Sequence, residues 1–545
     1  MLQLLLLVIQ LVFTFIIGIY FLTQLKTQAA SKTNIKKDSY LKCEKMSMLR
    51  ETKLTVPLTE VVRPKTEEDI IGQKEGLKAL KAALCGENPQ HILIYGNPGI
   101  GKTAAARIAL NIAKNTKGSP FKKEAPFIEI DATTLRFDER GIADPLIGSV
   151  HDPIYQGAGA YGPAGVPQPK MGAVTKAHGG VLFIDEIGEL HPVQMNKLLK
   201  VLEDRKVFLE SSYYTASDEN IPQHIHDVFQ NGLPADFRLI GATTRKREDI
   251  PAAIRSRCVE IFFKDLSYED IIEIVNNVLE RQKIIIDSHA KELLAKYANN
   301  GRDVVAMLQT ADSIVKMEKR NRIAQKDVEW VIETGMYSPR IDKKVDGLYH
   351  IGKVNGLGVS GFASGMVLDI EAVAKKVDKS CAQIKITGII EEEQLHLKNS
   401  TSKRKSMANS SVENVLTVLQ TNYDVNIDDY FIHLNFTSGI PIDGPSAGTA
   451  MFCALYSALF KKYISSSIAM TGEISIHGEI CPVGGVYEKI VAAKNAGVKK
   501  VFIPKANMQE LLIGIGVDII PVDNIEELIK HTFDMRQDAS HILHA

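Results

Sequence analysis

The sequence predicts an α/β domain with a parallel sheet and a small helical lid, followed by a mixed α+β domain. Three observations lead to this fold class. Within the first 265 residues, short apolar segments run into glycine-rich or polar residues, as buried parallel strands do. A long helical stretch follows, from Ser267 to Glu333. Strand-like alternation around single glycines then begins near Gly352.

The bulk composition limits the classes of protein that this chain can be. Its 545 residues are too many for one hydrophobic core. Its 65 basic and 65 acidic residues cancel, so the charge does not indicate a nucleic-acid partner. Its six cysteines are scattered without a CxxC pair, which fits neither a disulfide framework nor a zinc site.

The N-terminal segment, residues 2–24, is almost wholly apolar and carries no charged side chain. A helix of this length is long enough to span a bilayer. Lysines follow it from Lys26 to Lys45, and the positive-inside rule then places the remaining chain in the cytoplasm. The sequence therefore predicts a single-pass transmembrane helix, a tether over residues 25–60, and a location in the cytoplasmic membrane.

A phosphate-binding loop is predicted after the apolar segment 91–95. Strand, glycine-rich loop, Lys-Thr and helix follow one another in the order that a P-loop requires. The lysine would reach the β and γ oxygens of ATP, and the threonine would hold Mg²⁺. The loop consists of Gly96, Asn97, Pro98, Gly99, Ile100, Gly101, Lys102 and Thr103.

An acidic pair, Asp185 and Glu186, ends the next apolar segment, residues 181–184. Beside a P-loop, Asp185 would hold Mg²⁺ and Glu186 would polarise water. A strand that ends in a solvated loop is the alternative, and the P-loop upstream argues against it.

The segments that follow resemble those of the AAA+ ATPases. In that family, residues 69–73 correspond to the adenine side of the site, and Thr243 or Thr244 to the sensor of the γ-phosphate. Arg257 corresponds to the arginine finger offered to the neighbouring subunit, with Arg255 as competitor, and Arg302 to the second sensor on the lid. The resemblance implies ATP and Mg²⁺ as cofactors and a homo-oligomeric, hexameric ring. It places the α/β domain at residues 61–265 and the lid at 266–338.

Between the two nucleotide motifs lies a Gly/Pro-rich stretch that contains Tyr155 and Tyr161. One of these aromatic side chains is expected to grip an unfolded polypeptide in the central pore of the ring. A loop with incidental tyrosines is an equally weighted alternative.

In the C-terminal domain, Ser446 stands between glycines just before the apolar segment 449–460, which is predicted to be a buried helix. The hydroxyl would be a nucleophile where the helix dipole stabilises an oxyanion. The alternative is a helix N-cap, the common role of such serines.

Lys489 could activate this serine, because burial disfavours the ammonium form of lysine. It lies on an otherwise apolar helix face with Val486, Ile490 and Ala493. The alternative is a surface lysine whose amine stays in water. Spacing alone does not decide between the two.

Three segments, 443–448, 470–474 and 483–489, resemble in this order the Lon proteases, and with the ATPase motifs the chain is similar to the bacterial membrane-anchored LonB type. The resemblance implies a Ser446–Lys489 dyad in which Thr471 hydrogen-bonds the lysine. It implies that ATP drives the unfolding and threading of protein substrates, unfolded or damaged, into a closed chamber. The proteolytic domain would span residues 343–535, followed by a tail at 536–545.

The leading hypothesis is therefore a membrane-anchored, ATP-dependent serine protease. A membrane-anchored AAA+ remodelling ATPase without proteolysis is the alternative. A nucleic-acid motor is a third class, since residues 241–245 also look like a branch-migration helicase, but the zero net charge argues against it.

Overall fold

The computed structural model describes most of the chain, in two compact units, Met1–Val62 and Arg63–Ala545. The described residues are 13–21, 43–51, 54–135, 144–151, 167–211, 214–217, 221–340, 344–360, 364–388, 392–397, 400–405, 407–437 and 444–533.

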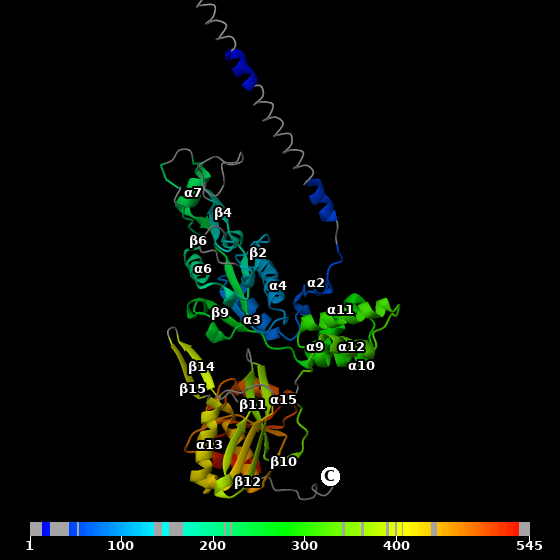
Figure 1. Cartoon of the computed structure of the whole chain (residues 1–545), viewed down its shortest axis with the longest axis vertical. Helices are drawn as coiled ribbons and strands as arrows, with labels where there is room; N and C mark the ends of the chain where they lie inside the picture. The colour runs from blue at the N-terminus through cyan, green and yellow to red at the C-terminus, as the bar shows by residue number, and fades with distance from the viewer. Residues whose placement is uncertain are drawn as a thin grey trace, which may run out of the picture. The chain divides into compact units, whose positions relative to one another are not determined.

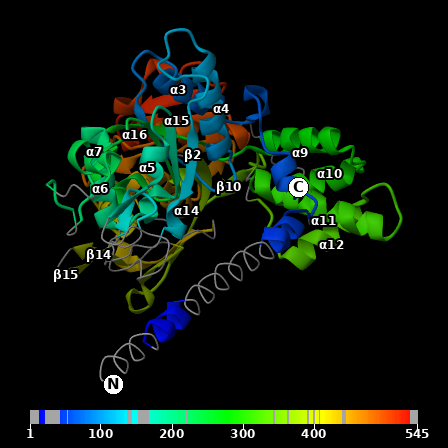
Figure 2. The same cartoon turned by 90° about the horizontal axis from the view of Figure 1, so that it is seen from above.

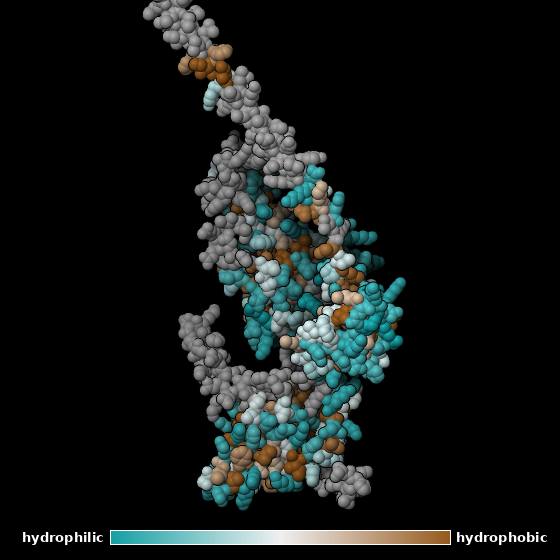
Figure 3. Space-filling view, turned by 45° about the vertical axis from the view of Figure 1, so that its right-hand side comes forward, coloured by the Kyte–Doolittle hydropathy of each residue, from teal (hydrophilic) through white to brown (hydrophobic). Residues whose placement is uncertain are grey.

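The N-terminal unit is helical at residues 13–21, at 43–51 and in α2 (Leu58–Val61). The apolar side chains of the first helix are exposed (Figure 3). The predicted cytoplasmic-membrane location is wrong, and membrane anchoring is not supported: in the parts of the chain that the structure describes, no helix is long and apolar enough to cross a bilayer. Residues 2–12 and 22–24 of the predicted span lie outside the described residues.

The first domain of the second unit is built on a five-stranded parallel sheet with strand order β2-β5-β8-β1-β9. Helices α3, α4 and α6 lie beside this sheet (Figure 1). The four residues from Ile92 to Tyr95 are fully buried, which explains why the predicted strand reads as a continuous apolar run. The strands are β1 (His91–Tyr95), β2 (Phe127–Asp131), β5 (Val181–Asp185), β8 (Arg238–Thr243) and β9 (Cys258–Phe262).

Around the sheet lie helices and two short antiparallel ribbons, which pair β3 with β4 and β6 with β7. The helices are α3 (Lys74–Leu84), α4 (Lys102–Asn115), α5 (Ala173–Lys176), α6 (Pro192–Asp204), α7 (Gln223–Asn231) and α8 (Ala252–Arg255). The strands of these two ribbons are β3 (Gly148–His151), β4 (Gln168–Met171), β6 (Lys206–Val207) and β7 (Leu233–Pro234).

The predicted helical stretch forms four helices, which lie together as one group (Figure 2). Ser267 begins it with a capping box, in which its hydroxyl accepts from the Asp270 N–H and the Asp270 carboxylate accepts from the Ser267 N–H. The helices are α9 (Tyr268–Gln282), α10 (Ser288–Tyr297), α11 (Gly301–Met317) and α12 (Gln325–Gly335).

The C-terminal domain has a seven-stranded mixed sheet with order β13-β16-β12-β11-β18-β21-β22. Neighbouring strand residues enter opposite cores: Met470 and Phe502 pack with α13 and α14, whereas Ala469 and Val501 pack with α15. The strands are β11 (Lys353–Ser360), β12 (Ser364–Lys376), β13 (Gln383–Thr387), β16 (Tyr430–Phe436), β18 (Ile468–Met470), β21 (Lys500–Pro504) and β22 (Asp518–Val522).

Three ribbons and four helices complete this domain. The ribbons pair β10 (Tyr349–Ile351) with β17 (Tyr463–Ser465), β14 (Glu392–Leu397) with β15 (Ser400–Lys405), and β19 (Glu473–Ile474) with β20 (Ile480–Cys481). The helices are α13 (Met407–Tyr423), α14 (Gly448–Phe460), α15 (Val486–Asn495) and α16 (Ile525–Phe533).

Candidate active sites

The predicted phosphate-binding loop joins β1 to α4 at the carboxyl end of the parallel sheet. Lys102, the first residue of α4, is only 7% exposed. Its Nζ donates to the carbonyl oxygens of Gly96 at 2.6 Å and Asn97 at 3.0 Å. Gly101, the N-cap of α4, supplies no capping side chain, so the first N–H groups of the helix are left for an anion.

The acidic pair lies beside this lysine. Burial raises the pKa of Asp185, and the charge of Lys102 opposes that rise. Burial likewise lowers the pKa of Lys102, and the charges of Glu186 and Asp185 oppose the fall. Glu186 has a left-handed backbone, with φ 49°, a conformation that costs free energy and that concentrates at functional sites.

The two sensor candidates take different places. Thr244 donates to the Glu186 carboxylate twice, from its backbone N–H at 2.9 Å and from its hydroxyl at 2.8 Å. Thr243 is fully buried, and its hydroxyl accepts from the N–H of Arg245 at 3.0 Å. Thr244 is therefore the one that reaches the acidic pair.

The lid meets the loop through the start of α11. Asn300 caps this helix by accepting from the N–H of Asp303 at 3.0 Å. The N–H of Gly301 donates to the carbonyl of Gly99 at 3.2 Å, and a Cβ on Gly99 would come within 2.6 Å of Asn300 Oδ1. Glycine is required there, also because its φ is 75°. Arg302 is close enough for its charge to lower the pKa of Lys102 further.

This donor set fits a nucleoside triphosphate with a divalent cation. Uncapped N–H groups and a buried lysine offer positive charge for phosphates, while Asp185 and the half-buried Thr103 offer oxygens that Mg²⁺ prefers. On the adenine side, Gln73 is buried and its amide binds the Lys264 backbone in both directions, at 2.6 Å and 3.1 Å.

The two arginine-finger candidates differ in exposure. Arg255 is half-buried and donates from Nε to the carbonyl of Ile250 at 3.0 Å. Arg257 is exposed, and its guanidinium pairs with Glu203. The tyrosines expected in the pore, Tyr155 and Tyr161, lie outside the described residues.

In the C-terminal domain, Ser446 lies within a 3₁₀ turn, Pro445–Ala447, directly before α14. The N-cap of α14 is Ala447, so the N-cap alternative for Ser446 does not hold. The backbone carbonyl of Ser446 accepts from the N–H of Gly472 at 2.9 Å and from the hydroxyl of Thr471 at 3.1 Å. The serine is thus fixed to the point where the chain leaves β18.

Lys489 is buried, 2% exposed, and its Nζ donates to Thr471 Oγ1 at 3.1 Å. Burial lowers its pKa to about 8, although the nearby Glu488 carboxylate favours the charged form. The surface alternative for this lysine is therefore excluded. Ser446, Thr471 and Lys489 are brought together across three separate elements, although among the described residues no hydrogen bond joins Ser446 Oγ to Lys489 Nζ.

Two residues matter here that the sequence reasoning did not find. Gly365, on β12, lies so near the start of α15 that a Cβ there would come within 2.0 Å of the Glu488 carbonyl oxygen. It sets the position of the helix that carries Lys489. Glu203 is the second missed residue, because nothing in its own helix marks it as a partner of Arg257.

His433 is the histidine nearest to Ser446 in the sequence. Its ring nitrogen Nε2 bonds to the hydroxyl of Thr387, on a neighbouring strand, at 3.1 Å.

Comparison with known protein families covers both domains. Residues 322–535 match the family model of the Lon protease (S16) C-terminal proteolytic domain. Residues 67–220 match that of the magnesium chelatase subunit ChlI.

Relatives match nearly the whole chain. Lon protease 2 of Bacillus subtilis (strain 168) is 55% identical over 523 residues, which cover 96% of this chain and 94% of that protein. The archaeal Lon proteases of Methanothermobacter thermautotrophicus and Archaeoglobus fulgidus are 28% and 29% identical over 78% of this chain, and over 68% and 70% of their own lengths.

A solved structure, the Thermotoga maritima RuvB Holliday junction branch migration motor, matches 50% of this chain and 72% of its own, with 22% identity and a TM-score of 0.34. That similarity is too low to support an argument. The relatives and the two family matches together span both domains. The chain belongs to the Lon protease family and is an ATP-dependent serine protease, with an AAA+ ATPase-like domain followed by a Lon proteolytic domain.

Proposed function

We propose that Ser446 is the nucleophile and Lys489 the general base of peptide cleavage, with Thr471 orienting the lysine. The observation that carries the proposal is the buried amine of Lys489, which donates to Thr471 while Thr471 donates to the carbonyl of Ser446. Because the lysine amine donates one hydrogen to Thr471, its orientation is fixed and its lone pair can accept a proton from the serine.

In this mechanism, Ser446 Oγ attacks the carbonyl carbon of the peptide bond and its proton passes to Lys489 Nζ. Lys489 then gives that proton to the leaving amine, and water hydrolyses the resulting ester. The start of α14 lies beside the serine, where the helix dipole would stabilise the oxyanion.

The nucleotide site is proposed to follow the predicted pattern. The loop Gly96–Thr103 holds the phosphates, with Lys102 on the β and γ oxygens, while Thr103 and Asp185 hold Mg²⁺. When bound, Mg²⁺ neutralises charge that develops on the phosphates. Glu186 orients the attacking water, Thr244 or Thr243 senses the γ-phosphate, and Arg302 acts as the second sensor on the lid.

Arg257 is proposed to complete the nucleotide site of the next subunit, because it is the exposed one of the two candidates. A finger that acts in trans requires a head-to-tail contact between subunits, and we propose that this contact closes into a homohexameric ring. The ring would draw unfolded or damaged proteins inward, with Tyr155 or Tyr161 as the gripping residue. The proposed domain limits are 61–265 for the α/β domain, 266–338 for the lid and 343–535 for the proteolytic domain, with a tail at 536–545.

Degradation of casein with ATP tests the assignment of both sites. Ser446→Ala and Lys489→Ala are expected to abolish cleavage while retaining ATP turnover, because their side chains lie in the other domain. Glu186→Gln is expected to stop both ATP turnover and degradation. Cleavage that survives Ser446→Ala would refute the dyad, and ATP turnover without any cleavage by the unaltered protein would favour the remodelling ATPase.

A further inference from the structure

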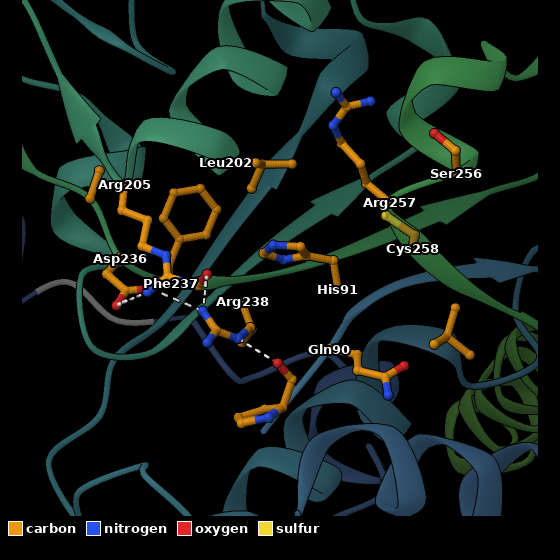
Figure 4. Close-up of a pocket in the computed structure, with 13 residues that line it drawn as sticks. Gln90, His91, Leu202, Arg205, Asp236, Phe237, Arg238, Ser256, Arg257 and Cys258 are labelled. Atoms are coloured by element: carbon orange, nitrogen blue, oxygen red, sulfur yellow. Dashed lines mark hydrogen bonds and ion pairs between the residues drawn. The ribbon is translucent and has the colours of Figure 1, made fainter. Parts of the chain in front are cut away.

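Arg257 lies at the rim of a cavity of about 430 Å³ near the amino ends of β1, β8 and β9. Two further arginines, Arg205 and Arg238, line this cavity (Figure 4). Both pair with one carboxylate, that of Asp236. Asp236 accepts from Arg238 at 3.0 Å and lies 3.9 Å from an Arg205 nitrogen.

Arg257 is held differently. Its guanidinium points away from Asp236 and Arg238 (Figure 4). It pairs with the carboxylate of Glu203, near the C-terminal end of α6, and donates to the carbonyl of Ala253 at 2.8 Å. Glu203 and Arg257 therefore lie on different elements of the domain. Their ion pair fixes the direction in which the Arg257 side chain points.

The ion pair is exposed on both sides. The side chain of Arg257 is 37% exposed and that of Glu203 is 55% exposed. Exposed pairs of this kind shift an equilibrium by only about 1.4- to 5-fold. A carboxylate and a phosphate can each accept two parallel hydrogen bonds from a guanidinium, and the phosphate carries more charge. Glu203 can therefore be exchanged for a phosphate, whereas a buried partner could not.

We propose that Glu203 is a positioning residue that holds the Arg257 guanidinium within its own subunit until a phosphate of the neighbouring subunit's nucleotide takes its place. The inference rests on the proposed trans role of Arg257. In this role, the Glu203 carboxylate competes with the nucleotide of the neighbouring subunit for the Arg257 guanidinium. Arg257 engages the neighbouring subunit only when the nucleotide there displaces Glu203.

The test is steady-state ATP turnover of the full chain, at a subunit concentration where specific activity no longer changes. Glu203→Gln removes the charge and keeps the shape. The KM for ATP is expected to fall by about 1.4- to 5-fold with kcat unchanged, because the guanidinium no longer has to leave a carboxylate. Glu203→Asp keeps the charge and is expected to restore the original KM.

Glu129→Gln is the matched control. Glu129 pairs with Arg107 at 2.5 Å, in an ion pair that is also exposed, on β2 of the same domain. Its loss is expected to change neither KM nor kcat. In an Arg257→Ala background, Glu203→Gln is expected to have no effect on the residual turnover, since its partner is gone.

Any other pattern overturns the inference. An unchanged or raised KM, or a lowered kcat, in Glu203→Gln would mean that the carboxylate does not compete with phosphate. A fall in KM that persists without Arg257 would mean that Glu203 acts through another group. If Arg257→Ala itself leaves kcat unchanged, the trans role fails as well. A lowered kcat in Arg257→Ala with an unchanged KM in Glu203→Gln refutes the competition alone.

Discussion

At the scale of single residues, two lysines stand out because they are buried, Lys102 and Lys489. Each donates to neutral oxygens, and burial lowers the pKa of each. Their surroundings differ. Lys102 lies near Asp185 and Glu186, whose charges favour the ammonium that a phosphate site needs. Among the described residues, Glu488 is the acid that opposes the desolvation of Lys489, and the pKa of Lys489 falls to about 8, the range that suits a general base.

The peptidase reaction should therefore depend on pH through Lys489. The base works only when neutral, so kcat/KM is expected to rise about tenfold per pH unit below about 8 and to level off above it. The measurement is cleavage of a short peptide between pH 6 and 9.5, with ATP turnover followed over the same range. A rate that is flat across pH 8, or one that falls, would contradict the assignment of Lys489 as the base.

At the scale of elements, the dyad depends on how closely β12 approaches α15. Gly365 allows the strand to pass against the carbonyl of Glu488, the residue before Lys489, the proposed base. A Cβ placed there would collide with backbone atoms, which cannot rotate away as a side chain can. The start of α15 would have to move, and Lys489 with it.

Gly365→Ala is expected to reduce proteolysis by at least about tenfold and to lower the stability of the C-terminal domain by about 1–3 kcal/mol, as overpacking does. ATP turnover should remain, because the nucleotide site lies in the other domain. Casein degradation, ATP turnover and thermal unfolding measure the three effects. Gly86→Ala is the control, since a Cβ at Gly86 meets open space. Full proteolysis by Gly365→Ala would show that this approach does not position the lysine.

The elements with strong local signals were predictable from the sequence. The apolar segments 91–95 and 449–460 became β1 and α14, because burial on all sides imposes continuous hydrophobicity. Residues 468–474 do not form one continuous strand. They split into β18 and β19 because residues 471–472 turn aside to bind Ser446, a contact between distant parts of the chain. Segment 399–411 is polar and basic in sequence, and yet it contains β15 and the start of α13.

The site residues divide in the same way, into those that lie in local sequence motifs and those that act through residues far away in the chain. Ser446, Lys489 and the P-loop lie in short motifs, which the resemblance to known families singled out as candidates. Gly365 and Glu203 act only through neighbours far away in the chain, so no spacing or periodicity could indicate them. The choice between Thr243 and Thr244 likewise depended on which side of β8 each hydroxyl faces, and at the end of a strand the sequence leaves that open.

At the scale of the whole molecule, the proposed role of Arg257 requires that each nucleotide site is built from two neighbouring subunits. A Lys102→Ala subunit would lack a working nucleotide site but would keep Arg257. An Arg257→Ala subunit would keep its nucleotide site but would lack the arginine finger. When the two are mixed, roughly a quarter of the interfaces in a random 1:1 ring carry both intact halves. The mixture is expected to turn over ATP faster than the sum of the two variants alone. A rate equal to that sum would argue against a finger in trans.

Covalent labelling with a fluorophosphonate tests the central claim most directly, because it reports which hydroxyl is nucleophilic. After digestion and mass spectrometry, the adduct is expected on Ser446 in the unaltered protein. The labelling rate should rise with pH up to about 8, following the pKa of Lys489, and Lys489→Ala should abolish the labelling. An adduct on another residue, or a Ser446 adduct that forms equally fast without Lys489, would contradict the dyad.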